Sequence, residues 1–530
     1  MPDKIKTDYK IGQHNITPFG LDIHNPVFVI SGLSIVAFVI ITLMFQEGAT
    51  AFFGWLRPTL TSTFDWFFLS AANIFVLFCI FLLVSPMGKI RLGGDDAKPD
   101  YGYVGWFAML FAAGMGIGLM FFGVSEPISH FSSSLGGTAM ENGARTDWAP
   151  LGAAAGDVDA ARSLGMAATI FHWALHPWSI YAVVALALAF FTYNYKLPLT
   201  LRSAFYPILG ERVWGWPGHM IDIMAVFATL FGIATSLGFG TEQALAGFNF
   251  LFGWGTGGVA KVLLITIITS MALISVLRGL DGGVKILSEI NIALASLLLL
   301  FVLIVGPTAA IFEAIFSGGI AYAKNLIPLS NPFGREDANF SQGWTAFYWA
   351  WWISWSPFVG MFIARVSRGR TIREFVFCVI VIPTLVTTVW MGAFGGTAIA
   401  QVVADAAAPV KSAALELKLF EMLKPLPFAT ITSFIGIVLV LVFFVTSSDS
   451  ASLVIDTITA GGKTDAPAAQ RVFWCVFEGL VAATLLLVGG KESLTALQAM
   501  AVSTGFPFTI ILLVMCVSLY MGLRKVVNKS

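Results

Sequence analysis

Twelve long apolar segments follow one another along the 530 residues, and they limit the possible folds more than any other feature of the sequence. A helix that crosses the hydrocarbon core of a bilayer needs about 20 consecutive apolar residues. Segments of at least about that length recur here, separated by shorter polar stretches. We therefore predict an all-α polytopic membrane protein with twelve transmembrane helices. The predicted helices lie at 26–46, 62–85, 101–124, 163–191, 216–252, 260–277, 284–311, 343–364, 372–402, 428–454, 470–489 and 494–522.

Composition and charge exclude several other classes of protein. Hydrophobic residues make up 57% of the chain and charged residues only 11%, against about 25% charged residues in soluble domains. The net charge is zero and no basic arm is present, so we expect no nucleic-acid partner. The zinc-protease, serine-hydrolase and dinucleotide-binding motifs do not occur, and the GGKT sequence at 461–464 lacks the first glycine of a P-loop. We expect no enzyme and no cofactor.

The distribution of positive charge predicts the orientation in the membrane. If the N-terminus lies inside, the inner segments carry 20 of the 30 Lys and Arg residues, and positive residues concentrate on the cytoplasmic side. The first apolar segment is not followed by a signal-peptide cleavage site, so it is expected to remain as a helix. We predict a multi-pass protein of the bacterial cytoplasmic (inner) membrane with both termini in the cytoplasm.

Two of the predicted helices contain residues that disfavour a regular helix. Gly114, Gly116 and Gly118 alternate within the third segment, and each costs about 1 kcal/mol relative to alanine. Gly114 and Gly118 also form a GxxxG pair, which would equally allow two helices to pack closely. Pro357 lies near the middle of the eighth segment and removes a backbone donor. Interrupted helices at corresponding positions of two halves indicate the binding site of a transporter.

The third and eighth segments each open a run of five helices, which predicts a 5+5 inverted repeat preceded by two extra helices. The units are an N-terminal cytoplasmic segment, two peripheral helices, the first repeat, a periplasmic connection with a surface helix near 316–328, the second repeat and a short cytoplasmic C-terminus. They cover 1–25, 26–100, 101–315, 316–342, 343–522 and 523–530. The polar stretch from Glu126 to Arg162 is predicted to be an outward loop.

Aromatic residues are concentrated in the fourth and eighth segments. Trp173, Trp178 and Tyr181 fall within an arc of roughly 140° on a helix, so all three can line one side of a cavity. Trp352 and Trp355 recur in the eighth segment at an interval of three residues. An interfacial aromatic belt is the alternative, but belts lie at helix ends and these residues lie further inside. Aromatic faces attract a quaternary ammonium, and backbone N–H groups of the glycine-rich break can bind a carboxylate. The pattern predicts a zwitterionic ligand.

Hydroxyl groups follow the apolar part of the tenth segment. Thr446 and Ser447 begin this cluster, which suits a sodium ion because hydroxyl and carbonyl oxygens are its ligands. The alternative is that these hydroxyls bond back to carbonyls of their own helix. Asp449 is expected near the cytoplasmic end of the helix, where it caps or pairs. His172 and His176 stand four residues apart without a third ligand in view, so we interpret them as structural.

Four motifs resemble those of the betaine/choline/carnitine transporter family. They are AAGMGIGLMFFGVSEP at 112–127, FHWALHPWSIY at 171–181, YWAWWISWSPFVGMFIARVSRGRTIREF at 348–375 and FFVTSSDSAS at 443–452. The resemblance implies a LeuT-like fold, transport by alternating access, and a homotrimer. It also implies a role in osmoprotection, although the chain ends soon after Arg524-Lys525 and lacks the long basic tail of osmotically regulated relatives.

The resemblance also implies roles for individual residues. The substrate would be bound by an aromatic box with two further tryptophans on its inward path and by the glycine-rich break: Trp173, Trp178, Tyr181, Trp352, Trp351, Trp355, Gly114, Gly116 and Gly118. A sodium ion would be bound by three main-chain carbonyls and two hydroxyls: Ala112, Met115, Phe443, Thr446 and Ser447. A second sodium site would involve Thr229 and Phe358, although Ile233 stands where a second threonine is expected.

Together these observations predict sodium-coupled uptake of glycine betaine or a similar zwitterionic quaternary-ammonium osmolyte. Gly118 supports this substrate, because choline-selective relatives tend to have an aspartate there. Uptake of choline, carnitine or dimethylsulfoniopropionate, coupled to protons or by exchange, is the alternative within the family. A channel or a membrane sensor is the alternative from another class.

Overall fold

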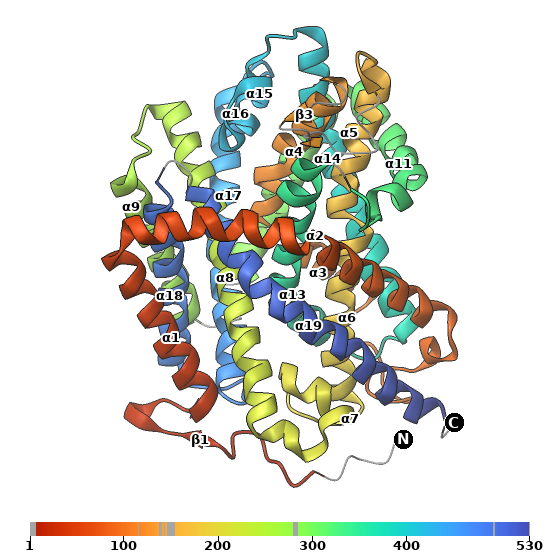
Figure 1. Ribbon diagram of the computed structural model, residues 1–530, viewed down its shortest axis with the longest axis vertical. Coiled ribbons are helices and arrows are strands. Elements are labelled where there is room, and N and C mark those ends of the chain that lie inside the picture. Colours follow the sequence, from red (N-terminus) through yellow and green to blue (C-terminus); the bar gives the residue numbers. More distant parts are fainter. Residues whose placement is uncertain are drawn as a thin grey trace.

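The computed structural model describes residues 7–114, 116–136, 140–141, 144–145, 154–278, 285–335, 337–490 and 493–528. This part of the chain is almost entirely helical (Figure 1). Its strands form two short antiparallel pairs, β1 (Asn15–Ile16) with β2 (Ile23–His24) and β3 (Met140–Glu141) with β4 (Ala144–Arg145). The prediction of an all-α membrane protein is confirmed at this level.

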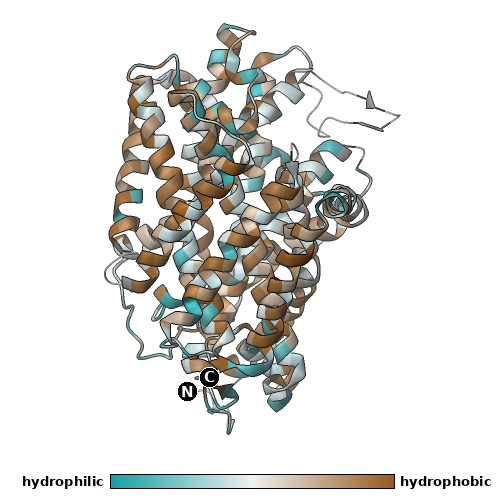
Figure 2. Cartoon of the chain, turned by 90° about the vertical axis from the view of Figure 1, so that its left-hand side faces the viewer, coloured by the Kyte–Doolittle hydropathy of each residue, from teal (hydrophilic) through white to brown (hydrophobic). Residues whose placement is uncertain are grey.

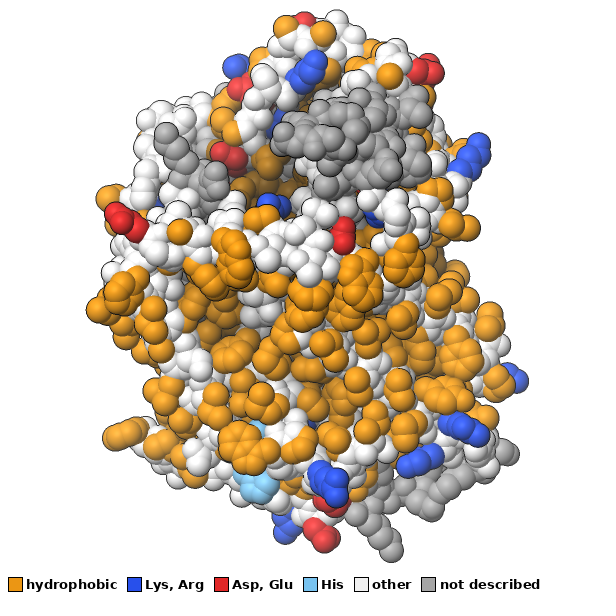
Figure 3. Space-filling view, viewed as in Figure 1, with side chains coloured by type: hydrophobic (Ala, Val, Ile, Leu, Met, Phe, Trp, Pro, Cys, Tyr) orange, Lys and Arg blue, Asp and Glu red, His pale blue; other side chains and the backbone are white. Residues whose placement is uncertain are grey.

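The outer surface of the helices is suited to lipid. Among the described residues, ten helices are long and apolar enough to cross a membrane. Hydrophobic residues predominate along the helices (Figure 2). On the face shown in Figure 3, hydrophobic side chains cover the middle and charged side chains lie mostly near the two ends. Both termini lie at the same end (Figure 1). The two remaining predicted segments correspond to a broken helix, α3 with α4, and to the tryptophan-rich α13.

The N-terminal helices α1 and α2 lie on the outside of the bundle. The first ends at Met44, and the chain turns sharply at Phe45 before α2 begins. Helix α2 begins 16 residues earlier than the predicted start at 62. This additional first part runs across the face of the other helices (Figure 1). The bounds are α1 (Asn25–Met44) and α2 (Gln46–Val84).

The first group of helices follows. It comprises α3 (Tyr103–Gly114), α4 (Ile117–Gly136), α5 (Val158–Trp173), α6 (Leu175–Tyr193), α7 (Tyr206–Leu209), α8 (Trp216–Phe252), α9 (Gly258–Arg278) and α10 (Lys285–Val305). A helix that begins after Gly306-Pro307, α11 (Thr308–Ser330), and the short α12 (Ala338–Phe340) connect it to the second group. Residues 316–328 are helical as part of α11, which packs against α5 and α14, and their place at the membrane surface stays a prediction.

The second group comprises α13 (Ala346–Val366), α14 (Ile372–Ala404), α15 (Pro409–Ser412), α16 (Lys418–Leu423), α17 (Ala429–Thr459), α18 (Ala468–Val488) and α19 (Ser493–Val527). Short 3-10 or π segments lie between helices: η1 (Pro18–Gly20), η2 (Pro86–Lys89), η4 (Leu201–Phe205), η5 (Gly210–Trp214), η7 (Ser341–Thr345) and η8 (Leu415–Leu417). The core forms where α13 packs on α6 and α8, and α14 packs on α4. All residues of α6 from His176 to Phe191 are buried, so this helix is surrounded by protein.

The glycine-rich break in the third segment is confirmed. Helix α3 ends at Gly114 and α4 begins at Ile117, with Gly116 in a bend between them. Helix α4 then continues to Gly136, and its residues from Ile117 to Ile128 are all buried. The assignment of Glu126 to an outward loop is therefore wrong: Glu126 lies inside the protein, in a helix that extends past the predicted end of the segment.

The expected break at Pro357 does not occur, because α13 passes through this proline without interruption. A proline removes the N–H that would bond to the carbonyl four residues earlier, here that of Ile353. The Ser356 hydroxyl donates to this carbonyl at 2.7 Å. A neighbouring side chain therefore replaces the missing bond, as serine and threonine do in membrane helices.

A break that the sequence analysis missed lies in the fourth segment. Helix α5 ends at Trp173 and α6 begins at Leu175, with Ala174 in a non-helical conformation at φ −110° and ψ −115°. Pro177 has no N–H that could donate to the Trp173 carbonyl, four residues earlier. This carbonyl instead accepts a hydrogen bond from the Thr387 hydroxyl of α14 at 2.9 Å. Pro177 was the available signal, and it lies beside the aromatic residues of the fourth segment.

Candidate functional site

A cavity lies beside the two helix breaks. We call it the aromatic cavity. Its walls come from α4, α5, α6, α13 and α14, so residues that are far apart in the sequence meet there. Its lining is Gly116, Gly118, Leu119, Trp173, Pro177, Trp178, Tyr181, Trp351, Trp352, Trp355 and Thr387. Nine residues were predicted to bind the substrate. Eight of them line this cavity, and the ninth, Gly114, is the last residue of α3.

The four rings of the predicted box meet nearly at right angles. The Trp173 and Trp352 ring centroids lie 4.9 Å apart with an interplanar angle of 74°. Trp178 and Tyr181 lie 5.4 Å apart at 75°, and Tyr181 and Trp352 lie 6.3 Å apart at 76°. All four side chains are buried. Perpendicular rings present both faces and edges to a shared space, which suits a compact cation.

Hydrogen bonds to backbone carbonyls of other helices fix two indoles that line the cavity. The Trp352 N–H donates to the His172 carbonyl at 3.0 Å, and the Trp351 N–H donates to the Gly232 carbonyl at 3.3 Å. In contrast, the Tyr181 hydroxyl and the Trp355 N–H are buried without a partner among the described residues. Both belong to residues that line the aromatic cavity. A buried donor without a partner is costly, so these two groups suit an acceptor supplied by a ligand.

Gly118 determines how closely α4 approaches the rings. A Cβ atom there would lie 3.0 Å from the Trp173 ring and 3.2 Å from the Trp351 ring, so either ring would have to move. At Gly116 a Cβ atom would lie 3.6 Å from Trp355, which is an ordinary contact. The two glycines therefore differ: Gly118 is needed for packing of the cavity wall, and Gly116 lies at the helix break.

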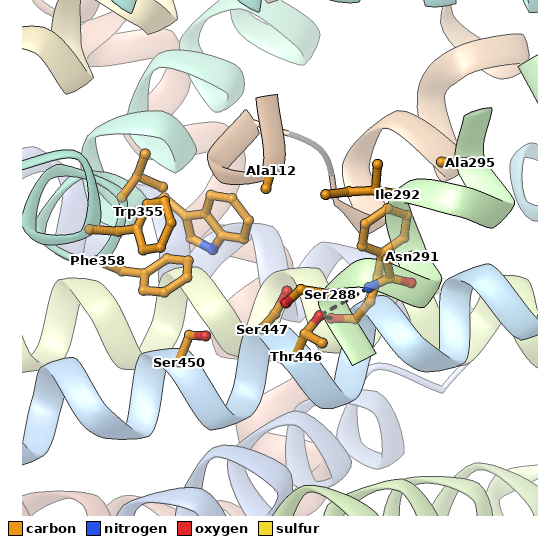
Figure 4. A pocket seen from close by; sticks show the side chains of 13 residues that line it. Ala112, Ser288, Asn291, Ile292, Ala295, Trp355, Phe358, Thr446, Ser447 and Ser450 are labelled. Carbon is orange, nitrogen blue, oxygen red and sulfur yellow. Dashed lines mark hydrogen bonds between the residues drawn. The ribbon is translucent and has the colours of Figure 1, made fainter. Parts of the chain in front are cut away.

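A second cavity adjoins the first, and Trp355 lines both. We call it the hydroxyl cavity. It is lined by Ala112, Ser288, Asn291, Ile292, Ala295, Trp355, Phe358, Val359, Phe362, Phe443, Thr446, Ser447 and Ser450. Figure 4 shows Thr446, Ser447 and Ser450 on α17 opposite Trp355 and Phe358. Four of the five predicted sodium ligands meet here, and the fifth, Met115, lies outside the described residues.

The hydroxyl cavity is lined by hydroxyl and amide side chains, whose oxygen atoms are the kind of ligand that a small hard cation prefers. The Thr446 hydroxyl donates to the carbonyls of Val442 at 3.0 Å and Phe443 at 3.2 Å, so the alternative of bonding within the helix is observed for this residue. The amide of Asn291 donates to the Thr446 oxygen at 3.2 Å (Figure 4). Sequence reasoning missed Asn291, although an asparagine inside an apolar helix is itself a signal.

Of the two residues predicted for a second sodium site, one lines the hydroxyl cavity and the other is not among its lining residues. Phe358 lines the hydroxyl cavity and packs edge-on against Trp355, with ring centroids 5.5 Å apart. Thr229 is buried on α8, and its hydroxyl donates to the Ala225 carbonyl at 2.7 Å. Ile233, one turn further along α8, is also buried and offers no oxygen. The second site stays a prediction.

A fully buried carboxylate that the sequence analysis missed lies behind the rings. One oxygen of Glu126 contacts His172 Nδ1 at 2.6 Å and His130 Nε2 at 3.1 Å. The other oxygen accepts from the Trp173 indole and the Tyr348 hydroxyl, both at 2.6 Å. His172 therefore has two neighbouring groups, Glu126 and His130, that its spacing with His176 did not reveal. The signal was a glutamate next to the apolar part of the third segment, since ionisable residues within a membrane are usually functional.

The two histidines and Glu126 could each offer a ligand atom to a metal ion, and these atoms lie within 4.8 Å of one another. However, Glu126 contacts both histidines at hydrogen-bonding distance, and its second oxygen already serves two donors. The arrangement is that of a carboxylate saturated with hydrogen bonds.

Asp449 does not lie at a helix end, because α17 continues to Thr459. Its carboxylate accepts from the Ser275 hydroxyl of α9 at 2.5 Å. Nearby, Glu478 of α18 accepts from Ser448 at 2.8 Å. These acids pair with hydroxyl groups inside the bundle and are not among the residues that line the two cavities.

Comparisons with known proteins agree with these motifs. A sequence profile described as betaine/carnitine/choline family transporter matches residues 26–528. A glycine betaine/proline/choline transporter of Vibrio parahaemolyticus is 65% identical over 98% of this chain and 94% of its own length. Glycine betaine transporter 1 of the same organism is 55% identical over 98% of this chain and 97% of its own length. A glycine betaine transporter of Acinetobacter baylyi is 42% identical over 94% of this chain and 73% of its own length. The matched range contains the residues that line both cavities.

Proposed function

The chain belongs to the betaine/carnitine/choline family of transporters, and from this premise we propose that it is a sodium-coupled symporter for glycine betaine or a similar zwitterionic quaternary-ammonium osmolyte. Its relatives are named as transporters of glycine betaine, and one of them also of proline and choline. The proposal extends that task to this chain and adds the coupling ion.

The aromatic cavity is the observation that carries the proposal. A trimethylammonium group has no N–H to donate and is poorly hydrated, so ring faces bind it better than hydrogen-bond acceptors do. No Asp or Glu occurs among the described residues that line the cavity. The donors without partners on Tyr181 and Trp355 suit the carboxylate of the same substrate. A zwitterion therefore matches the cavity better than a simple cation.

Sodium is proposed as the coupling ion because the hydroxyl cavity adjoins the substrate site. Thr446 and Ser447 supply hydroxyl oxygens there, and Ala112 and Phe443 lie against the same space. Trp355 lies between the two cavities, so an ion in one would restrict the ring that contacts the substrate in the other. Coupling is proposed through this site, and the second site at Thr229 and Phe358 stays a prediction, with Ile233 where a second threonine is expected.

The proposed mechanism is alternating access in a LeuT-like fold with twelve membrane helices, built as a 5+5 inverted repeat after two extra helices. The breaks at Gly116 and Ala174 support it, because broken helices beside a binding site free backbone groups for substrate and ions. The common end of the two termini fits their proposed place in the cytoplasm, with the protein in the inner membrane. A homotrimer is part of the proposal.

Uptake of radiolabelled glycine betaine into proteoliposomes tests the function. Vesicles with an inward sodium gradient, an inward proton gradient or no gradient are compared. Sodium-driven, saturable accumulation is the expected result, and it would also exclude a channel. Accumulation driven by protons alone would contradict the sodium site. Binding of betaine without flux under any gradient would favour a sensor, and absence of both would redirect the test to choline, carnitine and dimethylsulfoniopropionate.

A further inference from the structure

We propose that Glu126 is a positioning residue that fixes and polarises Trp173, so that the aromatic cavity prefers a cationic headgroup to a neutral one of the same shape. The inference rests on the proposed function, because it concerns how a quaternary-ammonium substrate is recognised. Glu126 does not line the cavity itself. It would act through the ring that it holds.

The contacts show that Glu126 holds the ring from behind. Its side chain is completely buried, and one carboxylate oxygen accepts both the Trp173 N–H and the Tyr348 O–H. An indole N–H can only donate, so the direction of this bond is certain. Trp173 is the last residue of α5 before the break at Ala174. At a helix end the backbone alone fixes a side chain less firmly than it does inside a helix. A charge-assisted hydrogen bond provides that constraint.

The other carboxylate oxygen is held as well, which keeps the group oriented. It contacts His172 and His130, and the far nitrogen of His172 bonds to the Thr345 hydroxyl at 2.9 Å. Four donor-capable groups around one carboxylate suit its ionised form. The charge therefore lies directly against the N–H edge of the Trp173 ring.

The electronic consequence follows from the direction of the hydrogen bond. When an N–H donates to an anion, electron density moves from the bond into the ring, and hydrogen-bonded groups in a low-dielectric interior polarise one another. A more electron-rich ring has a more negative face, and that face attracts a cation. Trp173 lines the cavity and lies perpendicular to Trp352, so the effect reaches the proposed headgroup. A neutral headgroup would gain little.

The experiment compares two ligands that differ only in that charge. Glycine betaine and 3,3-dimethylbutyrate share a carboxylate and a compact three-methyl headgroup, but the headgroup of the second has carbon in place of nitrogen and is neutral. The dissociation constants of both are measured with the full-length protein in nanodiscs at fixed sodium. The readout is the preference, the constant for 3,3-dimethylbutyrate divided by that for betaine.

The principal variant is Glu126→Gln, because a glutamine oxygen can still accept the Trp173 N–H but carries no charge. We expect the preference for betaine to fall about fivefold, the size of a cation–π contribution of about 1 kcal/mol. Glu478→Gln is the matched control, since it removes another buried carboxylate that bonds to hydroxyls and not to the cavity rings. Its preference should equal that of the unmodified protein.

A second variant tests the same point should Glu126→Gln fail to fold. Trp173→Phe removes the N–H, so its ring no longer responds to the carboxylate, and its preference should fall by a similar factor. If both single variants fold, Glu126→Gln in the Trp173→Phe background should cause no further loss of preference. Such a double-mutant cycle separates the coupling of the two residues from their separate effects.

The outcomes distinguish this inference from the proposed function. If the unmodified protein shows no preference for betaine, the proposed function fails and the inference fails with it. If the unmodified protein prefers betaine and Glu126→Gln keeps the full preference, the inference alone is wrong. Equal weakening of both ligands would also overturn it, because a merely structural role of Glu126 would not discriminate between them.

Discussion

The aromatic cavity and the hydroxyl cavity share Trp355 but are held together in different ways. The Trp352 N–H bonds to the carbonyl of His172 on another helix, so the position of the ring depends on how the helices pack. The Thr446 hydroxyl donates to carbonyls of its own helix, one turn back, and its oxygen accepts from the Asn291 amide of α10. A ring whose N–H donates across helices gives a preformed shape, whereas a hydroxyl that donates within its own helix can turn toward an ion without moving any helix.

This contrast implies that substitutions in the two cavities affect substrate binding and sodium dependence separately. A substitution in the aromatic cavity should weaken substrate binding and leave the sodium concentration needed for uptake nearly unchanged. Loss of a hydroxyl in the hydroxyl cavity should raise that sodium concentration and leave substrate binding nearly unchanged. Coupling through Trp355 would appear as a departure from this separation. The substitutions below test it, beginning with the largest expected effect.

Trp352→Ala should give the largest loss. The ring contributes a face of the aromatic cavity, and a desolvated cation–π contact of about 2 kcal/mol corresponds to a weakening of betaine binding by about 30-fold. The sodium concentration for half-maximal uptake, measured at saturating betaine, should change far less. The measurement is uptake in proteoliposomes over a matrix of betaine and sodium concentrations. Normal betaine transport in this variant would show that the assignment of the aromatic box is wrong.

Thr446→Ala should give the converse result. Loss of an oxygen ligand to a charged group costs about 1.5 kcal/mol, so the sodium concentration for half-maximal uptake should rise about tenfold. Thr446→Ser keeps the hydroxyl and should behave almost as the unmodified protein. Ser450→Ala is a control on the same helix, because Ser450 lines the hydroxyl cavity but is outside the proposed ligand set. An unchanged sodium dependence in Thr446→Ala would remove the ligand role of this hydroxyl.

Gly118→Ala should weaken betaine binding moderately by crowding the rings. The new Cβ atom would meet Trp173 at 3.0 Å and Trp351 at 3.2 Å, and overpacking of this kind costs about 1 kcal/mol or more, equivalent to about fivefold in affinity. Gly116→Ala is the matched control, since its Cβ atom would meet Trp355 only at 3.6 Å. Equal effects of the two substitutions on betaine affinity would indicate that flexibility of the helix break, and not ring packing, determines binding.

The sequence predicted which side chains converge better than it predicted where helices break. Aromatic spacing and the family motifs identified the cavity residues, because side chains on one face of a helix remain together whatever the helix does. Whether a helix breaks near a proline depends on which group bonds to the carbonyl that the proline leaves without an N–H donor. At Pro357 the partner is the adjacent Ser356, and the helix continues. Near Pro177 it is Thr387, distant in the sequence, and the helix is interrupted at Ala174.

Glu126 was missed for a related reason. It follows the apolar stretch of the third segment and begins a polar one, so hydropathy alone places it in a loop. The structure continues the helix because His130, His172 and the two ring donors together satisfy the carboxylate. Only a tertiary arrangement makes a charge acceptable at that position.

Thr387→Val should give the smallest effect and tests this explanation of the break. The substitution keeps the shape of the side chain but removes the hydroxyl that donates to the Trp173 carbonyl. Loss of one buried hydrogen bond costs about 1 kcal/mol, so we expect a slightly lower thermal stability of the purified protein and betaine binding weakened by about threefold. Thr388→Val is the control, because the Thr388 hydroxyl bonds only to the Thr384 carbonyl of its own helix. If both substitutions lower betaine affinity equally, the bond across the helices does not hold Trp173 in place, and the aromatic cavity is no more dependent on helix packing than the hydroxyl cavity is.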